Sequence, residues 1–532
     1  MATMVNLTID GREVSVRRGT TILEAAKTIG TEVPHYCYHP GMSSPAMCRV
    51  CLVEVEGASK PMPGCVTTVT EGQVVHTQSD EAIAQRRAVL EFYLVNHPLD
   101  CPICDMSGEC ALQDYVHAEG REQGRGREPK RIFGRDDFGG DVLFYGDRCV
   151  MCTRCVRFMS EVEQDHRLTV VERGNRSVID TFFDEGLEGT YWHGNIIDIC
   201  PVGALVSKDF LHKARAWDLE HTPSICTSCS QGCNIELHTR DNLVQRLKPR
   251  DNLDVNGWWM CDYGRHNYEW INQGGRIEAP LVRDSDGNAK AVGWSDALRE
   301  LLERASTLES ASVRAVASPL ASNEDLGALA ELVGALGGGE TVYRSVRADD
   351  EIPLKGFPTL VRRKDLAPNT TGAELIGMAR VGADDATGGL SDVASHDGVV
   401  LVLGDALPDQ DVAFGQSAAL YVYLGHHDAP AAQKADFVLP VTTFAEQEGT
   451  FTNYDGRVQR FWPALQAPGM ARPAWLVLGA LVGELTEKAG PRSAAEAFGA
   501  LSGAVSAFAG MGYEDIGTRG AIVNESVSLT GD

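Results

Sequence analysis

The chain is poor in basic residues and has no long apolar run. It contains 48 Lys and Arg residues against 74 Asp and Glu residues, which gives a net charge of −26. A nucleic-acid partner requires a basic surface, so this balance argues against nucleic-acid binding. The most apolar stretches, Val399–Leu403 and Trp475–Leu485, are too short to cross a bilayer, and we expect no direct membrane span.

The first ten residues show neither a basic n-region nor an apolar h-region, so we expect no secretory signal. We therefore place the protein in the cytoplasm, where thiols stay reduced. We also find no glycine-rich dinucleotide fingerprint preceded by a strand. The chain alone is not expected to bind a dinucleotide.

No cysteine follows Cys261, and all fifteen cysteines lie before position 262. Their Cys-x2-Cys spacing, in a large chain without an export signal, favours metal binding over disulfides. Iron–sulfur clusters are held by sets of four ligands, so we interpret the cysteines as four ligand groups of an electron relay. The predicted ligands are Cys37, Cys48, Cys51 and Cys65 in group 1, His97, Cys101, Cys104 and Cys110 in group 2, Cys149, Cys152, Cys155 and Cys200 in group 3, and Cys226, Cys229, Cys233 and Cys261 in group 4.

Group 1 lies in a segment with the pattern of a β-grasp ferredoxin domain. A tight turn at Asp10-Gly11 predicts a hairpin, and Thr21 with Glu24 forms a capping-box signature for a helix that ends near Gly30. The predicted strands are Val5–Ile9, Glu13–Val16, Val50–Glu56 and Gln73–Thr77. We predict a 2Fe–2S cluster here, although four cysteines are also a structural zinc set.

Group 2 has three cysteines and needs one more ligand. We prefer His97, because Pro98-Leu99-Asp100 gives a short, stiff approach to Cys101, and a helix over Ala82–Asn96 leads into it. Zinc binding and an idle surface histidine at 97 are the alternatives. The other candidate histidines are His35, His39 and His117.

Groups 3 and 4 each supply four thiolates. The run Cys149-x2-Cys152-x2-Cys155 with a distant Cys200-Pro201 is typical of a 4Fe–4S cluster. Group 4 predicts another, and its neighbours Gly232 and Gly264 give the backbone room to approach it. Zinc is again the alternative for both groups.

Several arginines lie near the predicted ligands in sequence. We expect surface positions for Arg49, Arg154 and Arg157 rather than a role in tuning the clusters. The segment Gly120–Arg131 contains five basic residues among glycines, and we predict a solvated linker rather than a positive strip beside the clusters.

The cysteine-free part of the chain alternates strands and helices, which predicts an α/β layer with a parallel sheet. The predicted strands are Val313–Ser318, Val399–Gly404, Ala419–Leu424 and Ala435–Val441, and the clearest helix is Asn323–Leu336, ending at Gly337. Beyond about Pro473, the Ala- and Gly-rich composition predicts helices and a loose end.

These motifs resemble the large iron–sulfur subunit, the G-type subunit, of bacterial NADH:quinone oxidoreductase, respiratory complex I. The matching motifs are Val33-Pro-His-Tyr-Cys-Tyr-His-Pro40, Cys48-Arg-Val-Cys-Leu-Val-Glu54, His97-Pro-Leu-Asp-Cys-Pro-Ile-Cys104, Cys149-Val-Met-Cys-Thr-Arg-Cys155 and Asp198-Ile-Cys-Pro-Val-Gly203. From Cys226 onward the chain resembles molybdopterin oxidoreductases instead. That likeness is carried by Trp259-Met-Cys-Asp-Tyr-Gly-Arg265, Ala435-Asp-Phe-Val-Leu-Pro-Val441 and Glu446-x-Glu448-Gly-Thr-Phe-Thr-Asn453.

The resemblance implies a multidomain α+β and α/β protein with one 2Fe–2S and three 4Fe–4S clusters. The implied domains are residues 1–81 (2Fe–2S ferredoxin-type), 82–122 (4Fe–4S with one His and three Cys ligands), 123–220 (4Fe–4S ferredoxin-like), 221–277 (molybdopterin-oxidoreductase-type 4Fe–4S) and 278–532 (a degenerate molybdopterin-oxidoreductase-like scaffold). No molybdopterin is expected, because no cysteine follows Cys261 to bind the metal and the last region is short for two pterins.

The function implied is electron transfer from a flavin- and NADH-binding subunit toward quinone, in a complex that translocates protons. We expect partners among the other peripheral-arm subunits, a peripheral position on the cytoplasmic side of the inner membrane, and no catalytic residue in this chain. An iron hydrogenase would need further cysteines downstream, a formate dehydrogenase would be longer, and a zinc-stapled scaffold conflicts mainly with group 3.

Overall fold

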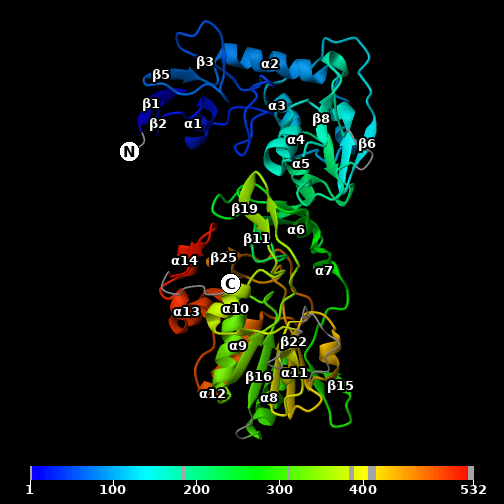
Figure 1. The fold of residues 1–532 in the computed structure, drawn as a ribbon, viewed down its shortest axis with the longest axis vertical. Coiled ribbons are helices and arrows are strands. Elements are labelled where there is room, and N and C mark those ends of the chain that lie inside the picture. The colour runs from blue at the N-terminus through cyan, green and yellow to red at the C-terminus, as the bar shows by residue number, and fades with distance from the viewer. Residues whose placement is uncertain (1–2, 182–185, 309–311, 383–388, 405–414, 525–532) are drawn as a thin grey trace. The chain divides into compact units, whose positions relative to one another are not determined.

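The computed structural model describes residues 3–181, 186–308, 312–382, 389–404 and 415–524. The chain forms two compact units, coloured from blue at the N-terminus to red at the C-terminus in Figure 1. Unit 1 is Met1–Leu219 with Leu354–Pro358, and unit 2 is Glu220–Pro353 with Thr359–Asp532. Groups 1 to 3 therefore lie in unit 1, and group 4 lies in unit 2.

Unit 1 begins with a five-stranded sheet in the order β2-β1-β5-β3-β4. Its strands are β1 (Met4–Ile9), β2 (Arg12–Arg17), β3 (Leu52–Val55), β4 (Met62–Pro63) and β5 (Gln73–His76), and α1 (Ile22–Thr28) packs on it. Asp10 and Gly11 turn the hairpin with φ of 48° and 78°. The capping box between Thr21 and Glu24 is present. The predicted hairpin, helix and strands are thus confirmed.

The rest of unit 1 consists of short elements around groups 2 and 3. The helices are α2 (Asp80–Leu94), α3 (Ala111–Glu119), α4 (Arg154–Arg157), a π-helical turn over Phe158–Glu163 and α5 (Asn195–Asp198). The strands are β6 (Arg135–Gly139), β7 (Val142–Tyr145) and β10 (Leu205–Ser207), in the order β10-β7-β6, and the hairpin β8 (Leu168–Val171) and β9 (Val178–Thr181). Single 3-10 turns span Cys101–Ile103, Gly146–Arg148, Gly174–Arg176 and Ala216–Asp218.

Unit 2 begins with an antiparallel sheet of β11 (Glu220–Ile225), β12 (Asn234–Arg240) and β13 (Leu243–Pro249), followed by α6 (Asp262–His266) and α7 (Glu269–Asn272). A second small sheet pairs β24 (Gly449–Thr452), β25 (Arg457–Phe461) and β26 (Ala521–Ile522). The strands β18 (Ile352–Leu354) and β19 (Phe357–Arg362) form a separate pair. The sequence pattern did not predict these antiparallel elements.

The centre of unit 2 is an eight-stranded sheet in the order β15-β14-β23-β22-β21-β16-β17-β20. Its members are β14 (Leu281–Arg283), β15 (Ala289–Ala291), β16 (Val313–Ala317), β17 (Gly339–Tyr343), β20 (Ala379–Arg380), β21 (Val399–Leu403), β22 (Leu420–Gly425) and β23 (Phe437–Pro440). The six strands from β23 to β20 run parallel, as predicted, and β14 and β15 add an antiparallel edge.

Helices cover both faces of this sheet. Besides α6 and α7, the helices of unit 2 are α8 (Trp294–Ser306), α9 (Asn323–Ala335), α10 (Thr370–Ile376), α11 (Gly389–Ala394), α12 (Ala474–Thr486), α13 (Ala494–Ala504) and α14 (Tyr513–Ile516), with 3-10 turns at Pro430–Lys434 and Ser506–Phe508. Val399 and Leu401 of β21 pack with α8, α9, α12 and α13, whereas Val400 and Val402 pack with α11. This alternation explains why β21 is apolar throughout. Among the described residues, no helix is both long and apolar enough to cross a membrane.

The segment 120–131 is a solvent-exposed loop, as predicted, and some of its basic residues also pair with α2. Arg121 and Arg125 pair with Glu91 of α2 at 3.1 and 2.6 Å. Lys130 donates to the carbonyl oxygens of Leu94 and Val95 at 2.7 and 3.2 Å. A cation at the last carbonyls of a helix offsets the negative end of its dipole. The loop thus caps α2, just before His97.

Candidate iron–sulfur sites

The four thiols of group 1 converge inside the first sheet domain. Cys37, Cys48, Cys51 and Cys65 are all buried, with at most 3% of their surface exposed. Hydrogen bonds connect the Cys37 thiol with those of Cys48 and Cys65, and the Cys51 thiol with that of Cys65. The hydrogen bond to Cys37 and then burial raise the pKa of the Cys48 thiol well above its usual value. Such a thiol releases its proton when it binds a metal, so the donor set fits a cluster.

Group 2 brings its three cysteines together around α3. Cys101 begins a 3-10 turn, Cys104 ends it and Cys110 precedes α3. Burial raises the pKa of the Cys110 thiol to about 11, with smaller contributions in the same direction from the nearby thiols of Cys104 and Cys101. A Cβ atom at Gly203 would lie 2.1 Å from the Cys104 sulfur. The chain therefore needs glycine at this position to make room for the sulfur.

Arg148 is a neighbour of both His97 and the group 2 cysteine Cys104. The positive charge of Arg148 disfavours a second proton on the His97 ring and favours the thiolate form of Cys104. Its Nε donates to Asp100 at 3.0 Å. Burial, followed by Lys130 and Arg148, lowers the pKa of His97 to about 4. The imidazole is therefore neutral at pH 7 and has a lone pair for a metal.

The other three candidate histidines are placed elsewhere. His35 Nδ1 is hydrogen bonded to the Val33 carbonyl at 2.8 Å, and His39 Nδ1 accepts from Gly41 N at 3.1 Å, both in the group 1 loop. His117 is exposed in the last turn of α3. These positions support the choice of His97 as the fourth ligand.

The cysteines of group 3 come from a tight loop and from a second, distant segment. Met151 and Thr153 adopt left-handed φ angles of 50° and 59°, which turn the backbone around Cys152. Cys155 lies in α4, and Cys200 follows α5. Burial raises the pKa of the Cys152 thiol to about 12, with Cys200 the next contribution. The loop thus concentrates thiols that only a metal would keep ionised.

Group 4 is built by the β11–β12 connection and the start of α6. Cys226 N donates to the Cys233 carbonyl at 2.8 Å, and Cys261 is the N-cap residue of α6. A Cβ at Gly264 would lie 2.8 Å from the Cys226 sulfur, so this glycine gives room as predicted. Gly232 is required for other reasons, because its φ is +64° and a Cβ there would meet Gln459 rather than a cysteine.

The prediction of surface positions is right for Arg49 and wrong for the other two arginines. Arg49 is exposed, whereas Arg154 is partly buried and Arg157 is only 8% exposed. Both buried guanidinium groups reach backbone carbonyls in the group 1 loop, 114 to 120 residues away in sequence. A sequence alone gives no signal for contacts over such separations.

Tyrosines fill the space among the ligand groups of unit 1. The Tyr36 ring is fully buried and lies 5.3 Å from that of Tyr93 and 5.5 Å from that of Tyr115. The Tyr36 backbone N donates to the Cys48 sulfur at 3.5 Å, and its hydroxyl has no hydrogen-bond partner among the described residues. Tyr93 donates to the Cys48 carbonyl at 3.1 Å. Sequence reasoning missed this cluster.

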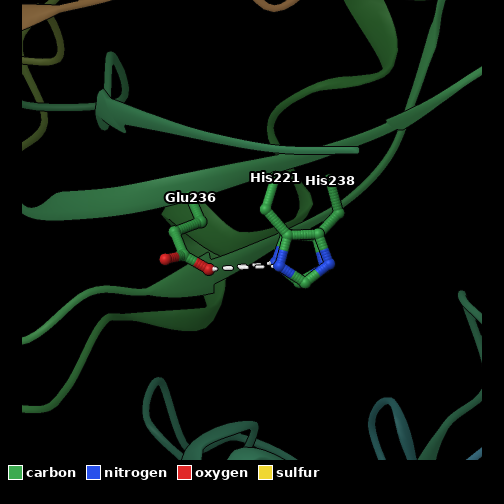
Figure 2. A group of neighbouring side chains, drawn as sticks. All are labelled: His221, Glu236 and His238. Carbon is green, nitrogen blue, oxygen red and sulfur yellow. Dashed lines mark hydrogen bonds and ion pairs between the residues drawn. The ribbon is translucent and has the colours of Figure 1, made fainter. Parts of the chain in front are cut away.

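A further set of possible ligands, His221, Glu236 and His238, has its ligand atoms within 4.8 Å of one another. Figure 2 shows the imidazoles on the side of the Glu236 carboxylate. The two rings are stacked, with their centroids 3.8 Å apart. Arg246 Nε, however, donates to His238 Nδ1 at 3.0 Å. His238 must then carry its proton on Nε2, which lies 3.2 Å from Glu236 and has no free lone pair. We interpret the cluster as a hydrogen-bonded stack joining β11, β12 and β13, not as a metal centre.

Five family models match the chain in order. They are a 2Fe–2S iron–sulfur cluster binding domain at 2–80, the NADH-ubiquinone oxidoreductase-G iron–sulfur binding region at 86–125, the ferredoxin-like domain of NADH-quinone oxidoreductase subunit 3 at 139–206, the molybdopterin oxidoreductase Fe4S4 domain at 219–273, and molybdopterin oxidoreductase at 366–484. This order confirms the predicted fold class.

Curated relatives carry matching names. The G-type subunit of NADH-quinone oxidoreductase from Rickettsia bellii is 38% identical over 322 residues, which are 60% of this chain and 47% of that protein. Over these residues the chain is similar to the G-type subunit of NADH-quinone oxidoreductases. The mitochondrial NADH dehydrogenase [ubiquinone] iron-sulfur protein 1 of Solanum tuberosum is 40% identical over 334 residues, 63% of this chain and 45% of that protein.

The chain spans about half the length of the curated relatives it matches. A solved structure of an NAD+-reducing [NiFe]-hydrogenase in the H2-reduced state also matches, at 29% identity over 40% of this chain and 90% of the other, with a TM-score of 0.35. The iron–sulfur domains that the family models identify are the ones that contain the cysteine groups.

Proposed function

We propose that this chain is the iron–sulfur relay subunit of the peripheral arm of an NADH:quinone oxidoreductase. Electrons would pass from a flavin- and NADH-binding subunit toward quinone, and the whole complex would couple this to proton translocation. The observation that supports the proposal best is that three separate sets of thiols gather within unit 1, among buried tyrosines. Bound iron–sulfur clusters supply one-electron redox centres, and the chain itself contributes no acid, base or nucleophile.

The proposed ligands are the sixteen predicted from the sequence, with His97 completing group 2. Group 1 would hold a 2Fe–2S cluster and groups 2, 3 and 4 a 4Fe–4S cluster each. The protein sets the potentials through ligand type, hydrogen bonds and burial. We also propose the predicted domain boundaries, the other peripheral-arm subunits as partners, and a peripheral location on the cytoplasmic side of the inner membrane.

We propose that unit 2 is a molybdopterin-oxidoreductase scaffold without the pterin. Ligands of open α/β sheets bind beyond the carboxyl ends of the strands, where neighbouring connections diverge. In this chain β17 and β21 flank β16 on opposite sides. The cavity that the described residues line at this edge measures about 30 Å³, with Trp270, His426 and Phe444 among its walls. Small-molecule pockets of roughly 300 Å³ or more are usual, and 30 Å³ is about the space of one water molecule.

Metal analysis of anaerobically purified chain tests this proposal. Full loading with one 2Fe–2S and three 4Fe–4S clusters gives about 14 iron atoms per chain, with no stoichiometric zinc or molybdenum. EPR spectra of the reduced protein should show several distinct clusters. Zinc in place of iron would support a stapled scaffold instead, and molybdenum near one per chain would contradict the scaffold assignment of unit 2.

A further inference from the structure

Two arginines, of which Arg157 is buried and Arg154 is partly buried, join the loop of group 1 to the predicted ligand segments of group 3. Arg154 lies between the ligands Cys152 and Cys155, and Arg157 lies two residues after Cys155. The α4 helix and the π-helical turn that follows it direct both side chains toward residues 37–43. Side chains of the group 3 segment therefore connect groups 1 and 3.

Arg157 reaches a ligand residue of group 1 directly. Its Nη2 donates to the backbone carbonyl of Cys37 and its Nη1 to that of Ser43. Its Nε lies 3.4 Å from the hydroxyl of Thr153, within the group 3 loop. One planar guanidinium thus holds both loops, a geometry that a single ammonium cannot reproduce.

Arg154 makes a second connection of the same kind. Its Nη2 donates to the carbonyl of Tyr38, next to Cys37, at 2.5 Å, and its Nη1 donates to the carbonyl of Ile199, next to Cys200, at 3.1 Å. Glu161 adds a third connection, because its carboxylate accepts from the backbone N and the hydroxyl of Ser43 at 2.9 and 2.5 Å.

The two arginines form no ion pair with a carboxylate within the described residues. The hydrogen bonds of Arg154 and Arg157 end on carbonyl or hydroxyl oxygens. Desolvation strongly disfavours a buried cation that has no anion beside it. The nearby Glu161 carboxylate is hydrogen bonded to Ser43 instead. Thiolates that hold a cluster would therefore supply the missing anions.

We propose that Arg154 and Arg157 are positioning residues that fix group 1 against group 3 and raise the reduction potentials at both. A nearby positive charge stabilises the reduced, more negative form of a cluster. The four hydrogen bonds from the two guanidinium groups to backbone carbonyls keep the spacing between the two groups constant. The inference rests on the proposed function only in that both groups hold clusters.

The test compares Arg154→Gln and Arg157→Gln with the control Arg49→Gln in the full-length chain, purified anaerobically. Arg49 lies beside Cys48 but is exposed, so its removal takes away one positive charge in water. Iron content, EPR-monitored redox titration of both clusters, and the magnetic interaction between them when both are reduced are measured. We expect iron to be retained, both potentials to fall in the Arg154 and Arg157 variants, and little change in the control.

Arg157→Lys distinguishes the effect of the positive charge from the effect of the hydrogen bonds to both loops. It also tests the proposal if Arg157→Gln fails to fold. It should keep the potentials near those of the unmodified chain but weaken or broaden the magnetic interaction, since lysine cannot hold both loops. Potentials and magnetic interactions that match the Arg49→Gln control in all three variants would overturn the inference. An unmodified chain without the two cluster signals would instead refute the proposed function.

Discussion

Arg86 and Glu119 form a bidentate ion pair inside unit 1, with Nε to Oε2 at 2.6 Å and Nη2 to Oε1 at 2.8 Å. The Arg86 side chain is completely buried and that of Glu119 is 16% exposed. Arg86 Nη1 also donates to the Thr77 carbonyl at 2.7 Å. The pair joins α2, which leads to His97, with α3, which starts after Cys110. Its energetic role is therefore to hold the two helices that present group 2.

Replacing Arg86 with methionine should lower the opening free energy of α2 and α3 by about 3–5 kcal/mol, because Glu119 would be left unpaired. Hydrogen–deuterium exchange of the two helices measures this free energy. The neighbouring Arg87→Met is the control, since Arg87 is exposed and donates only one bond, at 3.0 Å to the Glu119 carbonyl. Equal exchange rates in the two variants would show that the buried pair does not hold the helices together.

Gly203→Ala should remove the group 2 cluster. The new methyl carbon would lie 2.1 Å from the Cys104 sulfur, so the sulfur or the backbone must move. We expect the loss of about four iron atoms per chain and of one EPR signal, with the other clusters retained. Gly124→Ala is the matched control, because a Cβ there meets nothing within 4 Å. Full iron content in Gly203→Ala would contradict the placement of this cluster.

His97→Cys should retain a cluster in group 2 but lower its reduction potential, because a thiolate adds negative charge where a neutral imidazole stood. His97→Ala should lose the cluster and slow electron transfer from NADH to quinone. EPR-monitored redox titration distinguishes the two results. His117→Ala, an exposed histidine on α3, should change neither quantity. An unaltered EPR signal in His97→Ala would remove His97 from the ligand set.

Cys229→Ala should destabilise unit 2 more than it slows electron transfer. A metal site that closes the chain from Cys233 to Cys261 converts binding energy into folding energy. We expect a lower melting temperature or poorer assembly, with a nearly normal NADH-to-quinone rate per assembled complex. Cys152→Ala in group 3 provides the contrast, because it should abolish that rate. A normally assembled Cys229→Ala complex that has lost most of its rate would put group 4 on the electron path.

The buried carboxyl of Glu324 should make the stability of unit 2 depend on pH. Glu324 accepts hydrogen bonds from Thr450 N, Thr450 Oγ1 and Tyr513 Oη at 2.9, 2.9 and 2.8 Å, yet burial raises its pKa to about 7. The unfolded chain loses this proton near its ordinary value of 4.5. The folded state therefore binds more protons between these values, and the free energy of unfolding falls as pH rises from about 4.5 to 7.

Glu324→Gln should remove this slope, because the amide stays neutral and can still serve the same partners. Melting temperatures of the full-length chain between pH 5 and 8 measure the effect. Glu331→Gln changes an exposed carboxyl on the same helix and should leave the slope in place. Parallel pH profiles of the Glu324→Gln variant and the unmodified chain would disprove this coupling.

The sequence was sufficient wherever the signal is local. The hairpin turn at Asp10-Gly11 and the cap at Thr21 depend on neighbouring residues, so their patterns predicted β1, β2 and α1. The strands β16, β21, β22 and β23 were recognised because both faces of a parallel sheet are buried, which leaves continuous apolar runs. The cysteine spacing likewise predicted the four groups, because each contains a local Cys-x2-Cys pair.

Tertiary structure alone decided which distant residues meet at these groups. Arg157 donates to the carbonyl of Cys37, which is 120 residues away in sequence. Gly203 likewise lies against the sulfur of the distant Cys104. The sequence predicted Arg154 and Arg157 for the surface, because charged side chains are usually exposed. Burial of such a group is settled by the partners that folding brings to it, and a sequence pattern does not record those partners. The members of each predicted ligand group can thus be read from the sequence, whereas the contacts that join one group to the next arise only from packing.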